Sequence, residues 1–350
     1  ICKMDITTKS VTSPKGEVTL YTIRNASGAS VTLGNIGAGI VSVNVPDASG
    51  KMADVAMGYA DPLDYFYDGP CSGKIPGRYA GRIGQGRFSI DGVEYSLAIN
   101  NGPNALHGGP EGFQNRIWDA KLLEDGVEFS RVSPDGEEHY PGTLTVTATY
   151  RWSEDNVLTL NMRATTDART VLNLTNHAYF NLGGHNSGTA LDHILKLEAD
   201  TYVPTDETLV PFGRIDPVAG TPLDFVDAHP VRRDFFADFP ALKNGKGIDN
   251  SWVIRDYVPG KIQLAATMTD PVSGRKLEIC TDQPIVHVYA GCWIGDAPQG
   301  KDGYKYNDYD AISIECQDFP DAPNHPEFPS TVLSPEEEYN RTIQFKFSVK

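Results

Sequence analysis

The amino-acid sequence predicts an all-β protein with the architecture of a large antiparallel β-sandwich. Most of the chain consists of short segments in which apolar and polar residues alternate, and this period of two is typical of half-buried strands. The 34 glycines and 24 prolines favour many turns and few long helices. We count roughly eighteen to twenty such segments, and so many strands with scarcely a helix predict two packed sheets.

The segments expected to form strands follow one another along most of the chain. They are residues 17–25, 30–46 (as a pair of strands), 127–132, 144–152, 157–165, 170–175, 194–203, 261–270, 276–281, 286–290, 310–317 and 342–349. Residues 87–97 are expected to form a hairpin, because an Asp-Gly turn separates two alternating halves. A helical turn is expected within 61–68, and a short helix within 221–245, around 230–236.

The composition excludes several classes of partner. The 350 residues carry a formal net charge of −16, and such an acidic chain is repelled by nucleic acid and by anionic lipid. No apolar run approaches about 18 residues, so we expect no membrane span. Because no linker, charge block or repeat divides the chain, we expect a single domain over residues 1–350.

The start of the chain and the cysteines bear on the compartment. Residues 1–5 lack the apolar stretch of a signal peptide, which favours a cytoplasmic protein. They also lack an initiator Met, and a leader removed before Ile1 would make the protein periplasmic or exported, with Cys2 as the remnant of a lipidation site. The cysteines form no C-x-x-C pair, so we expect reduced, mostly buried thiols at positions 2, 71, 280, 292 and 316.

Five side chains lie in settings that suit chemistry: Arg82, His107, His177, Asp249 and Glu315. Arg82 lies in the glycine-rich segment 77–86, which no helix follows, so a nucleotide-binding loop is not expected. His107 lies in the polar, glycine-rich loop 100–112, a kind of segment that often carries function.

His177 is expected at the end of the 170–175 strand, where amide and phenol side chains surround it, a setting that suits an acid or a base. A structural role for a buried histidine is the alternative. Asp249 is expected on a turn over 247–252, and Glu315 near the end of a strand. His287 lies within a predicted strand, whereas exposed loops or element ends are expected for histidines 139, 185, 193, 229 and 325.

Two histidines and a carboxylate are compatible with three kinds of chemistry. His107, His177 and Glu315 could bind a non-haem iron, although no closely spaced His and acid indicates such a site. Asp249 and Glu315 could be the carboxylate pair of a glycoside hydrolase. A carboxylate and an imidazolium could also act together as general base and general acid, with the other residues binding substrate. The residues alone leave all three open.

Six motifs in register resemble the aldose 1-epimerases, the galactose mutarotases. They are residues 77–83 (GRYAGRI), 104–109 (NALHGG), 133–138 (SPDGEE), 173–182 (NLTNHAYFNL), 247–249 (GID) and 315–317 (ECQ), the last followed by PDA at 320–322. The resemblance runs in the same order over nearly the whole chain, which makes the set far more specific than any single motif.

The resemblance implies the β-sandwich of the galactose mutarotases and interconversion of the α and β anomers of free aldoses such as galactose and glucose. It implies no cofactor and no metal, and a monomer or a dimer is expected. By position, Glu315 matches the general base and His177 the general acid of this family. Arg82, His107 and Asp249 match substrate-binding positions, and His287 stands where an amide often contacts the substrate.

The chain departs from the family pattern at other positions as well, and these departures bear on sugar preference. Gly81 replaces an Asn, His139 replaces a Gly, and Asn250 replaces a His. Two rival functions use the same sandwich: a carbohydrate-binding protein without catalysis, and an epimerase of hexose 6-phosphates. The latter calls for clustered cationic residues, against which the charge of −16 speaks.

Overall fold

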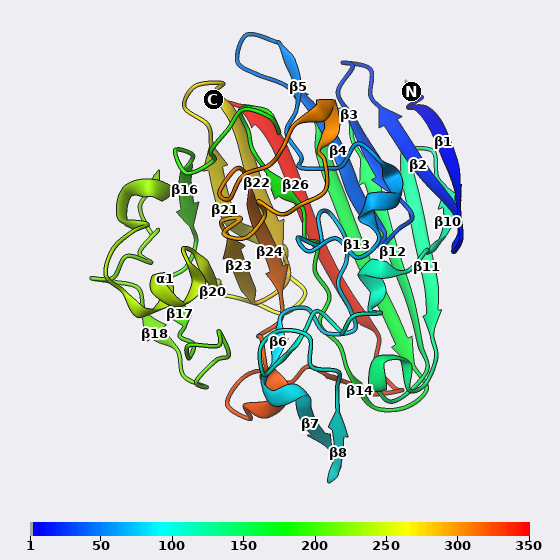
Figure 1. The fold of residues 1–350 in the computed structure, drawn as a ribbon, viewed down its shortest axis with the longest axis vertical. Coiled ribbons are helices and arrows are strands. Elements are labelled where there is room, and N and C mark those ends of the chain that lie inside the picture. Colours follow the sequence, from blue (N-terminus) through cyan, green and yellow to red (C-terminus); the bar gives the residue numbers. More distant parts are fainter. Residues whose placement is uncertain (1–2) are drawn as a thin grey trace.

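In the computed structural model, which describes residues 3–350, the chain forms three large antiparallel sheets and one short α-helix, confirming the all-β prediction. Figure 1 shows that strands make up most of the molecule and that the sheets overlap one another in this view. Cys2, and with it the proposed lipidation site, lies outside the described residues.

The nine-stranded sheet contains the longest strands. Its strands, in spatial order, are β10 (Asp119–Leu122), β11 (Gly126–Ser133), β12 (Leu144–Trp152), β13 (Val157–Thr166), β26 (Tyr339–Val349), β22 (Arg275–Thr281), β21 (Gln263–Thr269), β16 (Ile194–Leu197) and β19 (His229–Pro230). The pairing of β13 with β26 joins the middle of the chain to its end, since Val157 lies opposite Lys346.

Two further sheets and three small strand pairs complete the fold. The five-stranded sheet is β1 (Asp5–Ser13), β2 (Gly16–Arg24), β3 (Ser30–Gly34), β4 (Gly39–Pro46) and β5 (Met52–Asp54). The six-stranded sheet is β15 (Tyr179–Phe180), β24 (Ile312–Gln317), β23 (Ile285–Tyr289), β20 (Asp249–Val253), β17 (Thr201–Val203) and β18 (Asp216–Pro217). The pairs are β6 (Arg82–Ile83) with β9 (Ala105–Leu106), β7 (Arg87–Ile90) with β8 (Val93–Ser96), and β14 (Thr170–Val171) with β25 (Val332–Leu333).

One main hydrophobic core joins the three large sheets. It takes Val31 from the five-stranded sheet, Leu160 and Phe345 from the nine-stranded sheet, and Val286 and Ile314 from the six-stranded sheet. The alternating pattern explains this arrangement, because every second side chain of a strand points to the same face. The strands of the six-stranded sheet therefore bury one face in the core and leave the other face free to carry polar groups.

Three expectations about elements need correction. The polar edge strand β1 was not expected, since its exposed side chains give it no apolar face to recognise. Residues 194–203 form two strands in different sheets, β16 and β17, because the chain bends where Glu198 and Asp200 both bind Arg255. Residues 170–175 contain only the short β14, for the reason given with the site below.

The helix of the 221–245 segment lies later than expected. Residues 231–234 form a single 3-10 turn, whereas α1 spans Pro240–Gly245. Pro240 supports this start, because proline is favoured in the first turn of a helix and forces the preceding residue, Phe239, into an extended conformation. The other 3-10 turns are Pro62–Tyr65, which confirms the expected helical turn, and Gly84–Gly86, Phe113–Asn115, Glu137–His139, Lys301–Gly303 and Ala322–Asn324.

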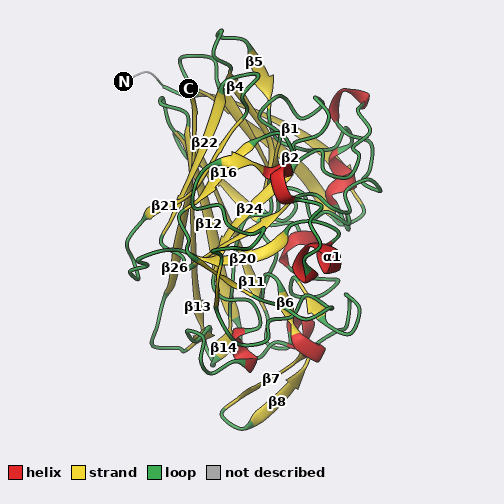
Figure 2. Ribbon diagram, turned by 90° about the vertical axis from the view of Figure 1, so that its left-hand side faces the viewer, coloured by secondary structure: helices red, strands yellow, loops and turns green. Residues whose placement is uncertain are grey.

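The position of the one α-helix and the burial of the thiols are both consistent with an all-β fold. Figure 2 shows α1 on the side of the molecule away from β13 and β26. Within residues 3–350, no helix is long and apolar enough to cross a membrane. The thiols of Cys71, Cys280, Cys292 and Cys316 are free and buried, as expected for reduced cysteines.

Candidate active site

A cavity of about 770 Å³ lies against the free face of the six-stranded sheet. On β24 the core takes Ile312, Ile314 and Cys316, so the intervening Glu315 and Gln317 point the other way and line the cavity. Register extends this polar face across neighbouring strands, since Glu315 lies opposite His287, and His287 lies opposite Ser251. The alternation of each strand thus explains why charged groups gather on one side of the sheet.

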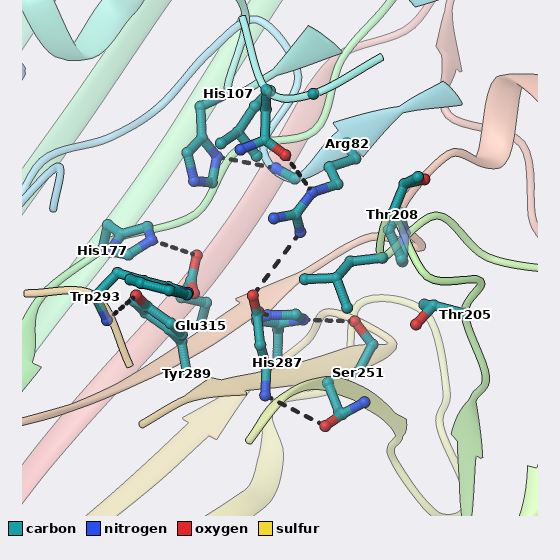
Figure 3. Close-up of a pocket in the computed structure, with 18 of the residues that line it drawn as sticks. Arg82, His107, His177, Thr205, Thr208, Ser251, His287, Tyr289, Trp293 and Glu315 are labelled. Atoms are coloured by element: carbon teal, nitrogen blue, oxygen red, sulfur yellow. Dashed lines mark hydrogen bonds and ion pairs between the residues drawn. The ribbon is translucent and has the colours of Figure 1, made fainter. Parts of the chain in front are cut away.

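All six residues predicted from the sequence line this one cavity. They come from six separate segments of the chain, which are β6, the loop after β9, the segment between β14 and β15, β20, β23 and β24. In this order the residues are Arg82, His107, His177, Asp249, His287 and Glu315. Figure 3 shows the labelled members of this set around the same space.

His177 lies on an irregular segment between β14 and β15, not at the end of a strand as expected. Neighbouring polar side chains pair with the backbone in place of a strand partner: the Thr175 hydroxyl donates to the Cys316 carbonyl at 2.6 Å, and the Asn176 amide donates to the Gly73 carbonyl at 2.8 Å. The backbone N–H of His177 itself donates to the Lys74 carbonyl at 2.8 Å. Of the amide and phenol side chains expected around His177, Asn176 instead anchors the backbone, whereas the Tyr179 ring does lie beside the imidazole, with the ring centres 5.1 Å apart.

The imidazole of His177 faces the carboxylate of Glu315. The distance from His177 Nε2 to Glu315 Oε1 is 3.4 Å, and both side chains are buried, with 6% and 3% of their surfaces exposed. Figure 3 shows this contact among the residues that line the cavity. The other ring nitrogen of His177, Nδ1, is buried and has no hydrogen-bond partner among residues 3–350. At 3.4 Å the contact is at the long end of hydrogen-bond distances, so this pair is close but not tightly bound.

His107 stands beside His177, with the two rings 5.1 Å apart and nearly perpendicular. Its Nδ1 accepts a hydrogen bond from the Gly81 N–H at 3.0 Å, so the neutral ring carries its proton on Nε2. Removal of the ring from solvent lowers the pKa of His107 well below its usual value, and the nearby His177 and Arg82 add to this effect. At neutral pH, His107 is therefore a neutral hydrogen-bond donor.

Arg82 and Asp249 face each other across the cavity. Arg82 Nη1 lies 3.9 Å from Asp249 Oδ2, and Arg82 Nε donates to the Asn101 side chain at 2.9 Å. Burial raises the pKa of Asp249, but the hydrogen bond from His287 and the charge of Arg82 outweigh it and lower that pKa to about 2. Asp249 is therefore ionised at neutral pH and can accept hydrogen bonds from a ligand. It opens strand β20 and does not lie on the turn that was expected.

His287 is bound through both of its ring nitrogens. Nε2 lies 2.7 Å from Asp249 Oδ1, and Nδ1 lies 2.7 Å from Ser251 Oγ. Burial lowers the pKa of His287, but the hydrogen bond and charge of Asp249, helped by Glu315, outweigh it, so the pKa is raised above its usual value. Ser251 was not predicted, although its place two residues after Asp249 in an alternating strand would have put it on the same face.

Aromatic side chains form one wall of the cavity near His177. Tyr179 and Tyr289 have their rings 5.9 Å apart, and the Tyr289 hydroxyl accepts a hydrogen bond from the Trp293 N–H at 2.9 Å. Trp293 remains 66% exposed at the mouth of the cavity, where the Lys246 ammonium lies 3.9 Å from the centre of its ring. None of these aromatic residues was predicted as a site residue, because isolated aromatics carry no spacing that distinguishes a cavity wall from a core.

Three of the histidines expected in exposed loops or at element ends are buried, and one of them, His229, does lie at the start of strand β19. His185 contacts the Tyr306 hydroxyl at 2.8 Å, and His193 Nε2 accepts from the Leu182 N–H at 2.8 Å. The ring nitrogens of His229 lie 2.8 and 2.9 Å from backbone carbonyls. None of the three lines the cavity, so their hydrogen bonds serve the fold.

The carboxylates and histidines do not form an evident metal site. Within residues 3–350, no group of three or more His, Cys, Asp or Glu side chains has an arrangement that could hold a metal ion. The chemistry available to the cavity's own residues is that of proton transfer and hydrogen bonding. A buried imidazole and a buried carboxylate in near contact are the residue types that general acid–base chemistry uses.

Comparisons with known proteins show the family to which this chain belongs. The aldose 1-epimerase family profile matches residues 19–346. The galactose mutarotase of Sus scrofa is 42% identical over 316 residues, covering 89% of each chain, and the aldose 1-epimerase of Escherichia coli K12 is 36% identical over 331 residues, covering 94% of each. A solved aldose epimerase homologue from C. elegans superposes with a TM-score of 0.87 at 31% identity, covering 98% of this chain and 99% of its own. The chain belongs to the aldose 1-epimerase family.

Proposed function

We propose that the protein interconverts the α and β anomers of free hexoses such as galactose and glucose. Relatives named galactose mutarotase and aldose 1-epimerase support this activity. The single observation that carries the proposal is the contact of His177 with Glu315, at 3.4 Å, inside the cavity. Anomer exchange requires one proton to leave the substrate while another arrives, and this pair can supply both functions.

Glu315 acts as the general base and His177 as the general acid. The carboxylate removes the proton of the C1 hydroxyl while the imidazolium protonates the ring oxygen, so the C1–O5 bond breaks and an open-chain aldehyde forms. Rotation about C1–C2 exposes the other face of the carbonyl, and the two residues exchange roles during ring closure. Because both reacting oxygens are bonded to C1, an acid and a base in near contact can reach them together.

The other predicted residues hold the sugar during this rotation. His107 donates from Nε2, Asp249 accepts as a carboxylate, and Arg82 donates from its guanidinium. Without these contacts, the open-chain form of the sugar would leave the cavity or reorient within it before the ring closes. The sequence also predicts a substrate contact for His287, and the hydrogen bonds of its ring favour a different role, which the next subsection develops.

The charge of the cavity favours a neutral sugar over a phosphorylated one. Among the described residues that line it, Arg82 is the only Arg or Lys, whereas the carboxylates are Glu207, Asp249, Asp296 and Glu315. A phosphate group would meet net repulsion in such a site. We therefore propose free aldoses as substrates. We also propose that residues 1–350 form a single epimerase domain.

Polarimetry on freshly dissolved α-D-galactose and α-D-glucose tests the proposal. We expect the protein to bring the optical rotation to equilibrium faster than buffer alone, with an unchanged rate in EDTA. A carbohydrate-binding protein without catalysis would bind galactose in calorimetry but leave the rotation at the buffer rate, and that result would overturn the proposal.

A further inference from the structure

His287 lies in a continuous hydrogen-bonded chain with a serine at one end and a carboxylate at the other. Ser251 Oγ and Asp249 Oδ1 each lie 2.7 Å from the two ring nitrogens of His287. Ser251 is buried, and strand register places it directly opposite His287. Figure 3 shows the ring of His287 turned toward Ser251. Both nitrogens of this histidine are therefore already bound to the protein.

The serine hydroxyl suits either charge state of the ring. When His287 is an imidazolium, Nε2–H donates to Asp249 and Nδ1–H donates to the Ser251 oxygen. When His287 is neutral, the hydroxyl reverses and donates its own proton to Nδ1, which leaves the ring proton on Nε2 facing Asp249. The contact with Asp249 thus survives deprotonation, and it occupies Oδ1 while Oδ2 faces Arg82.

We propose that Ser251 and His287 are positioning residues that act on the sugar through Asp249. The proposal rests on the proposed epimerase function, in which Asp249 accepts a hydrogen bond from the substrate. Ser251 fixes the tautomer of His287, and His287 fixes the orientation of the Asp249 carboxylate, so that Oδ2 remains available to the ligand. The two residues set substrate affinity and its pH dependence, not the proton transfer itself.

The charged neighbours of His287 come from every side of the cavity. Asp249 faces it from β20, Glu315 faces it from β24, and Arg82 faces it from β6. Asp249 and Glu315 favour the charged ring, whereas Arg82 disfavours it. Without Ser251, a neutral ring could place its proton on Nδ1 and turn the lone pair of Nε2 toward the Asp249 carboxylate, and this repulsion would displace the carboxylate.

The test compares Ser251→Ala, Ser251→Thr and His287→Gln by polarimetry on α-D-galactose across pH. At about pH 8 we expect Ser251→Ala to raise KM about fivefold while kcat changes less than about twofold, the size expected for loss of one hydrogen bond. At lower pH, where the imidazolium donates to Asp249 without help, the KM of this variant should approach that of the unmodified protein. Ser251→Thr keeps the hydroxyl and should retain KM within about twofold. His287→Gln offers an amide N–H and an oxygen but no titratable group, so its KM should not show the pH-dependent penalty of Ser251→Ala.

Ser313→Ala is the matched control. Ser313 is a buried serine of the same sheet, and its hydroxyl has no hydrogen-bond partner within residues 3–350. This variant should keep KM at every pH. A Ser251→Ala variant whose KM is unchanged, or raised equally at all pH values, would overturn the proposal, because a merely structural serine gives no pH-dependent penalty.

A second measurement separates this inference from the proposed function. The ¹⁵N chemical shifts of the His287 ring in the sugar-free protein report its tautomer without any turnover. We expect the neutral ring to carry its proton on Nε2 in the unmodified protein and on both nitrogens in exchange in Ser251→Ala. An Nδ1–H tautomer in the unmodified protein would overturn the proposed role of Ser251 and His287. Failure to accelerate mutarotation would overturn only the epimerase proposal.

Discussion

Two histidine–carboxylate pairs line the same cavity, and they differ in how completely their rings are bound. His287 and Asp249 are 2.7 Å apart, and Ser251 holds the second ring nitrogen of His287. His177 and Glu315 are 3.4 Å apart, and Nδ1 of His177 has no hydrogen-bond partner within residues 3–350. A histidine bound at both nitrogens is held in orientation, whereas one that is loosely paired can give and take a proton.

The difference follows from the elements that carry each pair. Asp249, Ser251 and His287 belong to adjacent strands in register, so regular pairing places their side chains within hydrogen-bond distance. His177 comes from an irregular segment whose backbone is not paired with β24, so its distance from Glu315 is not set by strand pairing. This difference supports the roles proposed above, substrate binding for the regular pair and proton transfer for the irregular one.

Glu315→Gln should have the largest effect. The amide keeps the size of the buried side chain but cannot accept a proton, so we expect mutarotation to slow by about 10²–10⁴-fold. Polarimetry measures the rate, and circular dichroism checks the fold. Glu278→Gln, on β22 outside the cavity, is the matched control and should keep full activity. A Glu315→Gln protein with undiminished rate would remove Glu315 from the mechanism.

His177→Asn should slow the reaction to a similar extent, about 10²–10⁴-fold, because the amide cannot protonate the ring oxygen. Residues that act in the same step give non-additive effects. We therefore expect the double variant with Glu315→Gln to be about as slow as either single variant. Rates that multiply in the double variant would mean that the two residues act independently, against the paired role assigned to them.

The same comparison shows how far the sequence could predict the site. Alternation predicts β24, and with it the face on which Glu315 lies, because strand periodicity is a local property. The 170–184 stretch begins with the same alternation, yet most of it is not a strand. Its Asn173 amide donates to the carbonyls of Ala80 and Asp318, which lie far away in the sequence. A local pattern of residues cannot predict such distant partners.

Ser251 illustrates the opposite limit. Its strand was expected to be a turn, so its shared face with Asp249 could not be predicted. Its contact with His287 also depends on the register between β20 and β23, which long-range packing decides. The resemblance to the aldose 1-epimerases predicted more of the site than the alternating pattern did, since it related side chains from six separate segments of the chain.

Asp249→Asn should have an intermediate effect, carried by substrate affinity. The substitution removes the charge that Arg82 and His287 face, and hydrogen bonds to charged groups are worth about 1.5–3 kcal/mol, so we expect KM to rise about 10- to 100-fold. The value of kcat should fall much less than in Glu315→Gln. Asp216→Asn, whose partner Arg214 lies outside the cavity, is the matched control and should keep KM. A large loss of kcat at unchanged KM would place Asp249 in the chemical step.

His287→Gln should have the smallest effect, on the pH dependence of stability. The folded-state pKa of His287 is raised above its usual value of 6.5, so its charged form stabilises the fold at lower pH, and this contribution is lost as pH rises through the raised pKa. The melting temperature of the unmodified protein should therefore exceed that of His287→Gln by more at about pH 6 than at about pH 9, by a difference of about 1–3 °C. Differential scanning fluorimetry at both pH values measures it, and an excess that grows toward high pH would show that the ring is held neutral, contrary to the tight pairing with Asp249.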